Sequence, residues 1–348
     1  MRPTAGLLVV AATALAGLAR TAGAPVLDWQ PQTSGVAARL RGISAVSDRV
    51  AWASGANGTV LRTVDGGRTW RKLRVPGADR LDFRDVDATS DRAAYVLSIG
   101  PGEASRIYKT VDAGGHWDLQ FANADPHVFL DAMTFRDDRH GIAFSDSVDG
   151  RFVILTTVDG RTWDRVAADR LPPARSGEGA FAASGTNVAM AAGRMWIGTT
   201  AGRVLRSTDD GHTWTVAETG LAAAQSAGIF SIAFRDAQHG VVVGGDYRKE
   251  SAAVDNVAWT SDGGTTWSLV KDHGLSGFRS VVAFVAGASR SRMALVAIGP
   301  AGVDWSDDDG RTWTAVVSPG FDTFSVARSG RVGWAAGTGG RISRWSAR

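Results

Sequence analysis

The residues with the clearest chemical potential in this sequence are aspartates that recur in one fixed setting. The setting is S/T-x-D-x-G-x-T-W, which first appears as TVDGGRTW over residues 63–70. Carboxylates repeated in this way could bind a cation or supply general acids. The aspartates of the six copies are Asp65, Asp112, Asp159, Asp209, Asp262 and Asp308.

The spacing inside this motif, known as the Asp-box, favours a structural role. An Asp side chain can accept backbone N–H bonds from the turn that follows it. Gly accepts a positive φ, the Thr hydroxyl ties down the second strand, and Trp packs a large face between sheets. A protein needs one active site, whereas this motif recurs along the chain. We therefore interpret the six aspartates as structural residues that stabilise turns, here called fasteners. Metal binding or acid catalysis is the less favoured reading.

Few residues in the sequence support glycan hydrolysis. A sialidase needs a tyrosine and glutamate pair, but the chain has few of either residue. Tyr95 aligns with Trp52 and is therefore expected in the core. A general glycosidase needs two carboxylates across a cleft. The tyrosines are Tyr95, Tyr108 and Tyr247, the glutamates are Glu103, Glu178, Glu218 and Glu250, and the best-placed carboxylates are Asp131, Asp146 and Glu178.

Other chemistries have weaker support in the sequence. Cysteine is absent, so thiolate nucleophiles and thiolate metal sites are excluded. Four of the six histidines fall in repeated turns, and the remaining two, without a third ligand, indicate no metal site. The net charge is +3 and the basic residues are scattered among acids, which argues against a nucleic-acid partner. We expect no cofactor and no metal.

The elements that carry the motif follow a period close to one propeller blade. Successive motif tryptophans, from Trp70 to Trp313, are separated by 47, 46, 51, 53 and 46 residues. In the first repeat the pattern predicts strands at 41–46, 49–54, 59–64 and 69–74, and no helical periodicity is convincing. The sequence therefore predicts an all-β fold of four-stranded blades.

A seventh repeat is incomplete at the end of the chain. RVGWAAGTGGRISRW at 331–345 matches RVAWASGANGTVLRT at 49–63 and supplies three strands. The fourth strand is expected from VLDWQPQ at 26–32, with Trp29 in the place of the motif Trp. An N-terminal strand in the last blade would close a seven-bladed β-propeller over residues 25–348 without a free edge. We expect a monomer.

The first residues predict a signal peptide at 1–24. Arg2 is followed by an apolar stretch, GLLVVAATALAGLA, and then by small residues. The stretch is too short for a stable membrane anchor, and no integral membrane segment is expected after its removal. We therefore expect an exported protein, periplasmic or extracellular.

The repeats, the F-R-D…H-G strand pairs and SGEGAFAASGTNVAMAAG at 176–193 resemble the photosystem II assembly and stability factor family and its bacterial relatives. The resemblance covers about residues 26–348. It implies an exported, non-catalytic propeller that binds a protein partner such as a membrane-protein assembly intermediate. The chain departs from the cyanobacterial pattern by lacking a lipidation cysteine. A sialidase-like glycoside hydrolase acting on an extracytoplasmic glycan stays the alternative.

The candidate binding residues lie on the face opposite the Asp-boxes. There the connections between blades surround the mouth of the channel, and a site is expected among them. The repeat alignment places Arg41, Arg84, Asp131, Gly179, Phe230, Arg279 and Thr323 at the starts of the inner strands. Arginine at three positions predicts a patch for anions or proteins, unless each arginine pairs with a nearby Asp. Residues expected to extend it are Arg170, Arg175, Glu178, Arg248 and Lys249.

Overall fold

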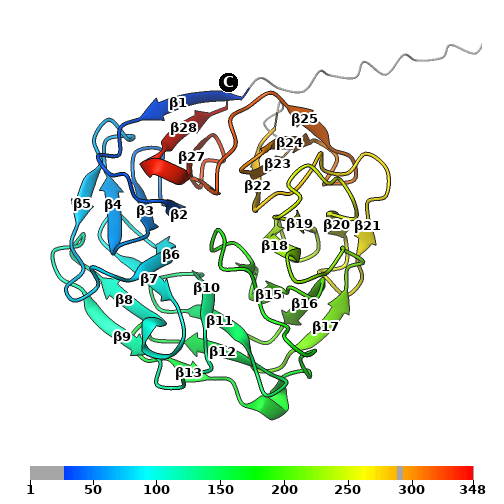
Figure 1. Ribbon diagram of the computed structural model, residues 1–348, viewed down its shortest axis with the longest axis horizontal. Helices are drawn as coiled ribbons and strands as arrows, with labels where there is room; N and C mark the ends of the chain where they lie inside the picture. The colour runs from blue at the N-terminus through cyan, green and yellow to red at the C-terminus, as the bar shows by residue number, and fades with distance from the viewer. Residues whose placement is uncertain (1–26, 288–292, 348) are drawn as a thin grey trace, which may run out of the picture.

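The computed structural model is a ring of seven four-stranded antiparallel sheets around a central axis (Figure 1). The structure describes residues 27–287 and 293–347. In blades 1 to 6 the first strand lies nearest the axis. The strands of blades 1 to 3 are β2 (Leu40–Ala45), β3 (Ala51–Gly55), β4 (Thr59–Thr63) and β5 (Arg71–Leu73); β6 (Asp82–Ala88), β7 (Ala94–Ile99), β8 (Arg106–Thr110) and β9 (Asp118–Ala122); β10 (Leu130–Phe135), β11 (Gly141–Val148), β12 (Arg151–Thr157) and β13 (Asp164–Arg165).

Blades 4 to 6 repeat the same order. Their strands are β14 (Val188–Ala191), β15 (Arg194–Gly198), β16 (Arg203–Ser207) and β17 (Thr215–Glu218); β18 (Ala227–Phe234), β19 (Gly240–Asp246), β20 (Val257–Thr260) and β21 (Ser268–Leu269); β22 (Val281–Ala286), β23 (Met293–Gly299), β24 (Gly302–Ser306) and β25 (Thr314–Val316). Three single-turn 3-10 helices, Gly102–Ala104, Ala168–Arg170 and Thr338–Gly340, lie in the connections of the described part of the chain.

Blade 7 joins the two ends of the chain. It contains β26 (Thr323–Val326), β27 (Val332–Ala336), β28 (Ile342–Ser346) and, outermost, β1 (Asp28–Gln32). β1 pairs antiparallel with β28, and Trp29 lies opposite Trp345. The predicted all-β, seven-bladed propeller is confirmed. The expected signal peptide at 1–24 lies outside the described residues, and no helix among the described residues is long and apolar enough to cross a membrane.

Each Asp-box turn is held by its own polar groups. In the first copy Asp65 Oδ1 accepts the Thr69 N–H at 3.0 Å, and Asp65 Oδ2 accepts the Thr69 hydroxyl at 2.8 Å. Thr63 donates its hydroxyl to Asp65 and accepts the Gly67 N–H. These bonds lower the pKa of Asp65 to about 2. The carboxylate oxygens are engaged by donors of the turn, as expected of a fastener.

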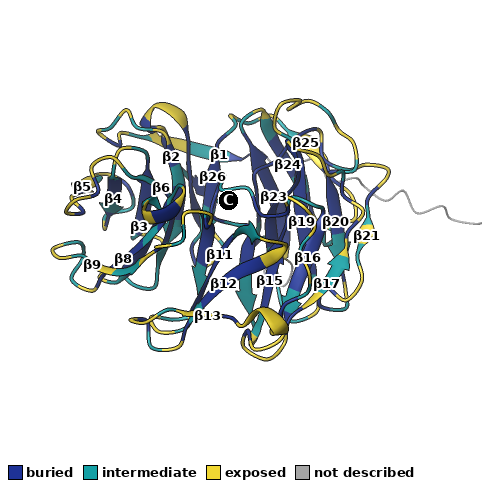
Figure 2. Cartoon of the chain, turned by 60° about the horizontal axis from the view of Figure 1, so that its bottom comes forward, coloured by how far each residue is buried: buried dark blue, intermediate teal, exposed yellow. Residues whose placement is uncertain are grey.

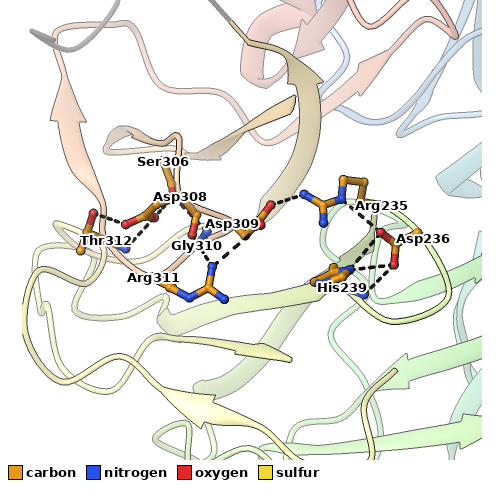
Figure 3. Close-up of polar contacts among 9 residues, drawn as sticks. All are labelled: Arg235, Asp236, His239, Ser306, Asp308, Asp309, Gly310, Arg311 and Thr312. Carbon is orange, nitrogen blue, oxygen red and sulfur yellow. Dashed lines mark hydrogen bonds and ion pairs between the residues drawn. The ribbon is translucent and has the colours of Figure 1, made fainter. Parts of the chain in front are cut away.

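The F-R-D…H-G strand pairs link neighbouring blades. In blade 5, Phe234 stacks on Trp196 of blade 4 with ring centroids 3.6 Å apart. Gly240, opposite Phe234 in the sheet, leaves room for that ring, because a Cβ there would lie 2.5 Å from it. Arg235 donates to Asp309 in the Asp-box turn of blade 6, as Figure 3 shows. Blade 3 makes the equivalent pair from Arg136 to Asp210 of blade 4 at 2.9 Å. The repeated motif therefore fixes how one blade sits on the next.

Candidate functional site

The two faces of the ring differ in what they carry. Because the sheets are antiparallel, the Asp-box turn and the first hairpin turn of blades 1 to 6 lie on one face, and the remaining connections lie on the other. We call the second one the loop face. Figure 2 shows that the strands are largely buried and that the exposed residues gather in the connections. The longest insertions, 167–181 and 244–256, belong to the loop face.

A cavity of about 550 Å³ opens on the loop face at the mouth of the central channel. We call it the mouth cavity. Its lining comes from the inner strands and loops of several blades: Arg39, Arg41, Arg84, Ile99, Phe129, Asp131, Asp146, Ala180, Phe181, Ala182, Ala183, Phe230, Tyr247, Glu250, Phe278, Ser280, Pro300 and Asp322.

The floor of the mouth cavity is a segment of the chain that enters the channel. The segment Phe181–Thr186, here called the plug, precedes β14 and runs toward the centre of the ring (Figure 1). Ser184 donates its hydroxyl to Ser280 O of blade 6 at 2.7 Å, and Thr323 of blade 7 donates to Ser184 O at 3.2 Å. Thr186 donates its hydroxyl to Ser231 of blade 5 at 2.8 Å. The plug is thus tied to blades on several sides of the channel.

Four of the lining side chains point into the cavity because the inner strands that carry them contain β-bulges at equivalent positions. In β2, β6, β10 and β18 the pairing register shifts where the strand begins. The extra residues at these bulges are Arg41, Arg84, Asp131 and Phe230. A bulge re-aims a side chain out of the regular alternation, which brings all four to the mouth cavity.

Two of these arginines bind the plug. Arg84 donates to Ala182 O at 2.7 Å and forms an ion pair with Asp82 at 2.7 Å. Arg41 donates to Ala183 O at 3.3 Å and has no ion pair among the residues that the structure describes. Burial and the nearby Arg84 charge lower the pKa of Arg41 to about 10, so its guanidinium still carries a positive charge at neutral pH. A third arginine, Arg39, is held by a two-point pair with Asp322.

An acidic pair lies at another side of the same cavity. Asp131 is 1 % exposed, and its Oδ2 has no hydrogen-bond partner among the described residues. Burial and then the Asp146 carboxylate raise its pKa well above the usual range. Asp146 accepts the Ala180 N–H at 3.2 Å, and burial raises its pKa as well. Both shifts have the same cause, because burial disfavours the charged form of a carboxylate.

Aromatic rings form the apolar wall of the mouth cavity. Phe181 of the plug stacks on Phe230 with centroids 3.9 Å apart. Phe278 and Tyr247 meet Phe230 edge to face, at 4.6 and 6.2 Å. Tyr247 is 41 % exposed, so the wall continues from the buried core to the rim. The cavity therefore combines guanidinium groups, an acidic pair and an apolar surface.

The structure corrects the position expected for Arg279. Its backbone N–H donates to Gly244 O of the previous blade, just as the Leu40 N–H donates to Gly337 O. Arg279 therefore corresponds to Leu40, and Ser280 takes the place of Arg41 and lines the cavity. With its guanidinium 3 % exposed, Arg279 pairs with Asp304 at 2.7 Å. Arg279 thus follows the alternative expectation, in which an arginine pairs with a nearby aspartate instead of lining the mouth.

The other expected residues are dispersed. Glu178 is buried and is held by Arg203 and by the Thr199 hydroxyl, so it anchors the chain before the plug instead of facing the cavity. Gly179 belongs to that anchor, and the inner strand of blade 4 starts only at Val188. Arg175 pairs with Glu218 at 2.6 Å on the surface, and Arg248 lies over the ring of Tyr247 at the rim.

Sequence reasoning missed several lining residues. Phe181, Tyr247 and Phe278 had no assigned role at the channel, and Arg39 and Asp322 were not noticed as a pair. The available indication was the insertion before β14, since blade 4 is longer than the first two repeats. An insertion between the outermost strand of one blade and the innermost strand of the next ends beside the channel mouth.

These features define a seven-bladed propeller whose channel is plugged and whose loop face carries a polar and aromatic cavity. No family model matches the sequence, and no curated protein matches it. Solved structures share the fold, two of them as follows. "YCF48 bound to D1 peptide" is 17% identical with a TM-score of 0.62 and covers 93% of this chain and 99% of its own. YCF48 from Cyanidioschyzon merolae is 16% identical with a TM-score of 0.63 and covers 91% and 98%. The propeller fold that the resemblance implies is therefore confirmed.

Proposed function

We propose that this protein is an exported, non-catalytic binding protein that docks a protein partner on its loop face and acts in assembly. The observation that carries the proposal is Arg41, a desolvated guanidinium in an open cavity with no ion pair among the described residues. Buried charges are normally paired, so an unpaired one at a cavity favours a ligand with an acceptor group.

The surroundings of the mouth cavity suit a protein surface. The rim carries Arg248 and Lys249 on the inserted loop 244–256, next to the exposed ring of Tyr247. Aromatic and arginine side chains are the residues that most often dominate protein interfaces. A propeller of the same fold has been solved with a bound peptide, which supports a partner of this class. We propose a membrane-protein assembly intermediate as that partner.

Partner capture from the native host tests the proposal. The protein is cross-linked in intact cells and recovered, and the variant Arg41→Gln/Arg84→Gln is compared with the unaltered chain. The matched control is Arg68→Gln, an exposed arginine in an Asp-box turn on the opposite face. We expect the double variant to lose a discrete partner while the control keeps it. If all three proteins recover the partner equally, the loop-face cavity does not take part in partner binding.

One observation favours the glycosidase alternative, namely that Asp131 and Asp146 meet in the cavity while Glu178 does not. Their raised pKa values would suit a general acid. Hydrolysis of a panel of aryl glycosides and sialosides, with Asp146→Asn as the control, tests it. Turnover that disappears in Asp146→Asn would establish the hydrolase instead of the binding protein.

A further inference from the structure

Buried acidic side chains lie along the plug. Asp85 of β6 is 4 % exposed, and Asp131 of β10 is 1 % exposed. Asp146 of β11 lies beside Asp131, and Asp87 of β6 lies near Asp85, because the charge of each neighbour raises the pKa of the more buried carboxyl group. In the part of the chain that the structure describes, none of the four forms an ion pair with a cation. Burial without a paired cation favours the protonated form of a carboxylate.

Two glycines let these carboxylates touch the plug and the chain that leads to it. Gly185 of the plug has no room for a Cβ, because Asp85 Oδ1 occupies that position. At Gly179, just before the plug, Asp146 Oδ1 fills the same place. Asp146 also accepts the Ala180 N–H at 3.2 Å. The docked plug therefore covers carboxylates near both of its ends.

The equivalent position in blade 5 shows what a carboxylate adds at Asp85. Asp85 follows the bulge of β6, and Ser231 follows the bulge of β18. Each accepts an N–H from the inner strand of the next blade, Asp85 from Met133 at 2.8 Å and Ser231 from Val282 at 3.0 Å. Thr186 of the plug donates to Ser231, so this position faces the plug in both blades. A hydroxyl makes these contacts without titrating, whereas a carboxylate makes them dependent on pH.

The arginines at the two ends of the channel are engaged elsewhere. At the mouth cavity Arg84 pairs with Asp82, Arg39 pairs with Asp322, and Arg41 donates to a carbonyl of the plug. The remaining titratable residues there are Tyr247 and Glu250. A second cavity, of about 440 Å³, lies beside Asp87 on the Asp-box face, where Arg136 pairs with Asp137 and Asp210. Its other charged residues are Asp138 and Arg328.

Ionisation of the buried carboxylates opposes docking of the plug. Burial raises the pKa of Asp85 and Asp131 well above the usual range and also raises the pKa of Asp146. Around a released plug these groups would meet water and ionise near the ordinary Asp pKa of about 3.9. The docked state therefore binds protons more strongly than the released state. Its advantage is complete below the ordinary value and is lost as the pH rises toward the raised values, by up to about tenfold per pH unit for each linked carboxylate.

We propose that the plug is a pH-operated gate, which proton uptake by Asp85, Asp131 and Asp146 docks in the channel and which proton loss releases. Release would remove the floor of the mouth cavity and open the cavity to the channel. This property belongs to the isolated protein and does not depend on a partner, so partner capture and plug opening are tested separately.

Cysteine labelling measures opening of the plug, since the chain has no cysteine of its own. Ala183→Cys places a thiol in the plug, where the native side chain is 7 % exposed. At each pH its rate of reaction with a small disulfide reagent is divided by the rate of Thr215→Cys, an exposed position, which cancels the pH dependence of the thiol itself. We expect the ratio to rise at least about tenfold from pH 5 to pH 7, the change that loss of about one proton over one pH unit implies.

Neutral variants assign the effect to the carboxylates. Asp85→Asn keeps an acceptor for the Met133 N–H and cannot ionise, so Asp85→Asn/Asp131→Asn should flatten the rise of the Ala183→Cys ratio. Asp149→Asn is the matched control and should keep the rise. Asp149 is exposed in the turn between β11 and β12, and its φ of 51° suits Asn equally well. If the double variant does not fold, the pH series on the native carboxylates still decides.

A buried thiol outside the plug separates gating from unfolding. Ser54→Cys is nearly isosteric, and Ser54 is 0 % exposed in β3. Its labelling ratio should not rise from pH 5 to pH 7. A ratio for Ala183→Cys that is equal at both pH values would overturn the proposal. So would an equal rise at Ser54→Cys, which would mean that the whole domain opens, or an unchanged rise in the double variant, which would assign the proton to other groups.

Discussion

Replacing Arg279 with alanine should destabilise the fold strongly and leave the mouth cavity chemically unchanged. The guanidinium and the Asp304 carboxylate are 3 % and 1 % exposed and lie 2.7 Å apart. Arg279 also donates to Phe278 O at 2.8 Å and to the Ser276 hydroxyl at 2.6 Å. Arg279→Ala removes these bonds and leaves Asp304 as an uncompensated buried charge. A broken buried pair costs about 3–5 kcal/mol of unfolding free energy.

Urea unfolding followed by tryptophan fluorescence measures this loss. The double variant Arg279→Ala/Asp304→Ala should be less destabilised than the sum of the two single variants, because it leaves no unpaired charge. Arg248→Ala is the control and should change the unfolding free energy by less than about 0.5 kcal/mol. If Arg279→Ala melts like the control and partner capture is lost, Arg279 acts at the surface and the burial argument is refuted.

Three further predictions concern the frame that holds the site. The pKa values of Asp65, Asp209 and Asp262 are lowered to about 2 from 3.8. Their contribution to stability is therefore full above the unfolded pKa and is lost as the pH falls toward 2. The difference in unfolding free energy between pH 5 and pH 2.5 should be smaller in Asp65→Asn/Asp262→Asn than in the unaltered chain. Gly240→Ala places a Cβ 2.5 Å from Phe234 and should cost about 1–3 kcal/mol, whereas Gly274→Ala, whose nearest contact is 3.5 Å, should melt normally. Deleting residues 25–32 exposes the edge of β28 and should lower the melting temperature and promote aggregation; melting like the parent chain would show that β1 does not hold blade 7 closed.

Much of the fold could be predicted because the information is local and repeated. The Asp-box has its donors and acceptors within a few residues, so Thr63 and Asp65 reveal their turn without knowledge of the rest. The period of the motif then gives the blade, and the alternation on either side gives the strands. The match between 331–345 and 49–63 indicated a seventh blade, which the structure contains.

The candidate site could be predicted only in part, because it depends on contacts between distant blades. Arg41 and Arg84 were placed correctly at the mouth, since a bulge keeps the same position in both strands. The repeat alignment matches Arg279 with Arg41, whereas in the structure Ser280 takes that place. A shift of one residue in a strand moves a side chain to the opposite face of the sheet. The plug was not foreseen, because no local pattern tells that Ser184 meets Ser280 and Thr323 across the channel.

Photo-cross-linking from two positions in living cells can locate the surface on which a partner docks. One protein carries the photoreactive residue in place of Tyr247, which is 41 % exposed at the rim of the mouth cavity. The other carries it in place of Val64, which is 45 % exposed in an Asp-box turn on the opposite face. We expect one discrete cross-linked protein from position 247 that disappears when Arg41 and Arg84 are both replaced by glutamine, and no such product from position 64. A product from position 64 alone would contradict this expectation and place the docking surface on the Asp-box face.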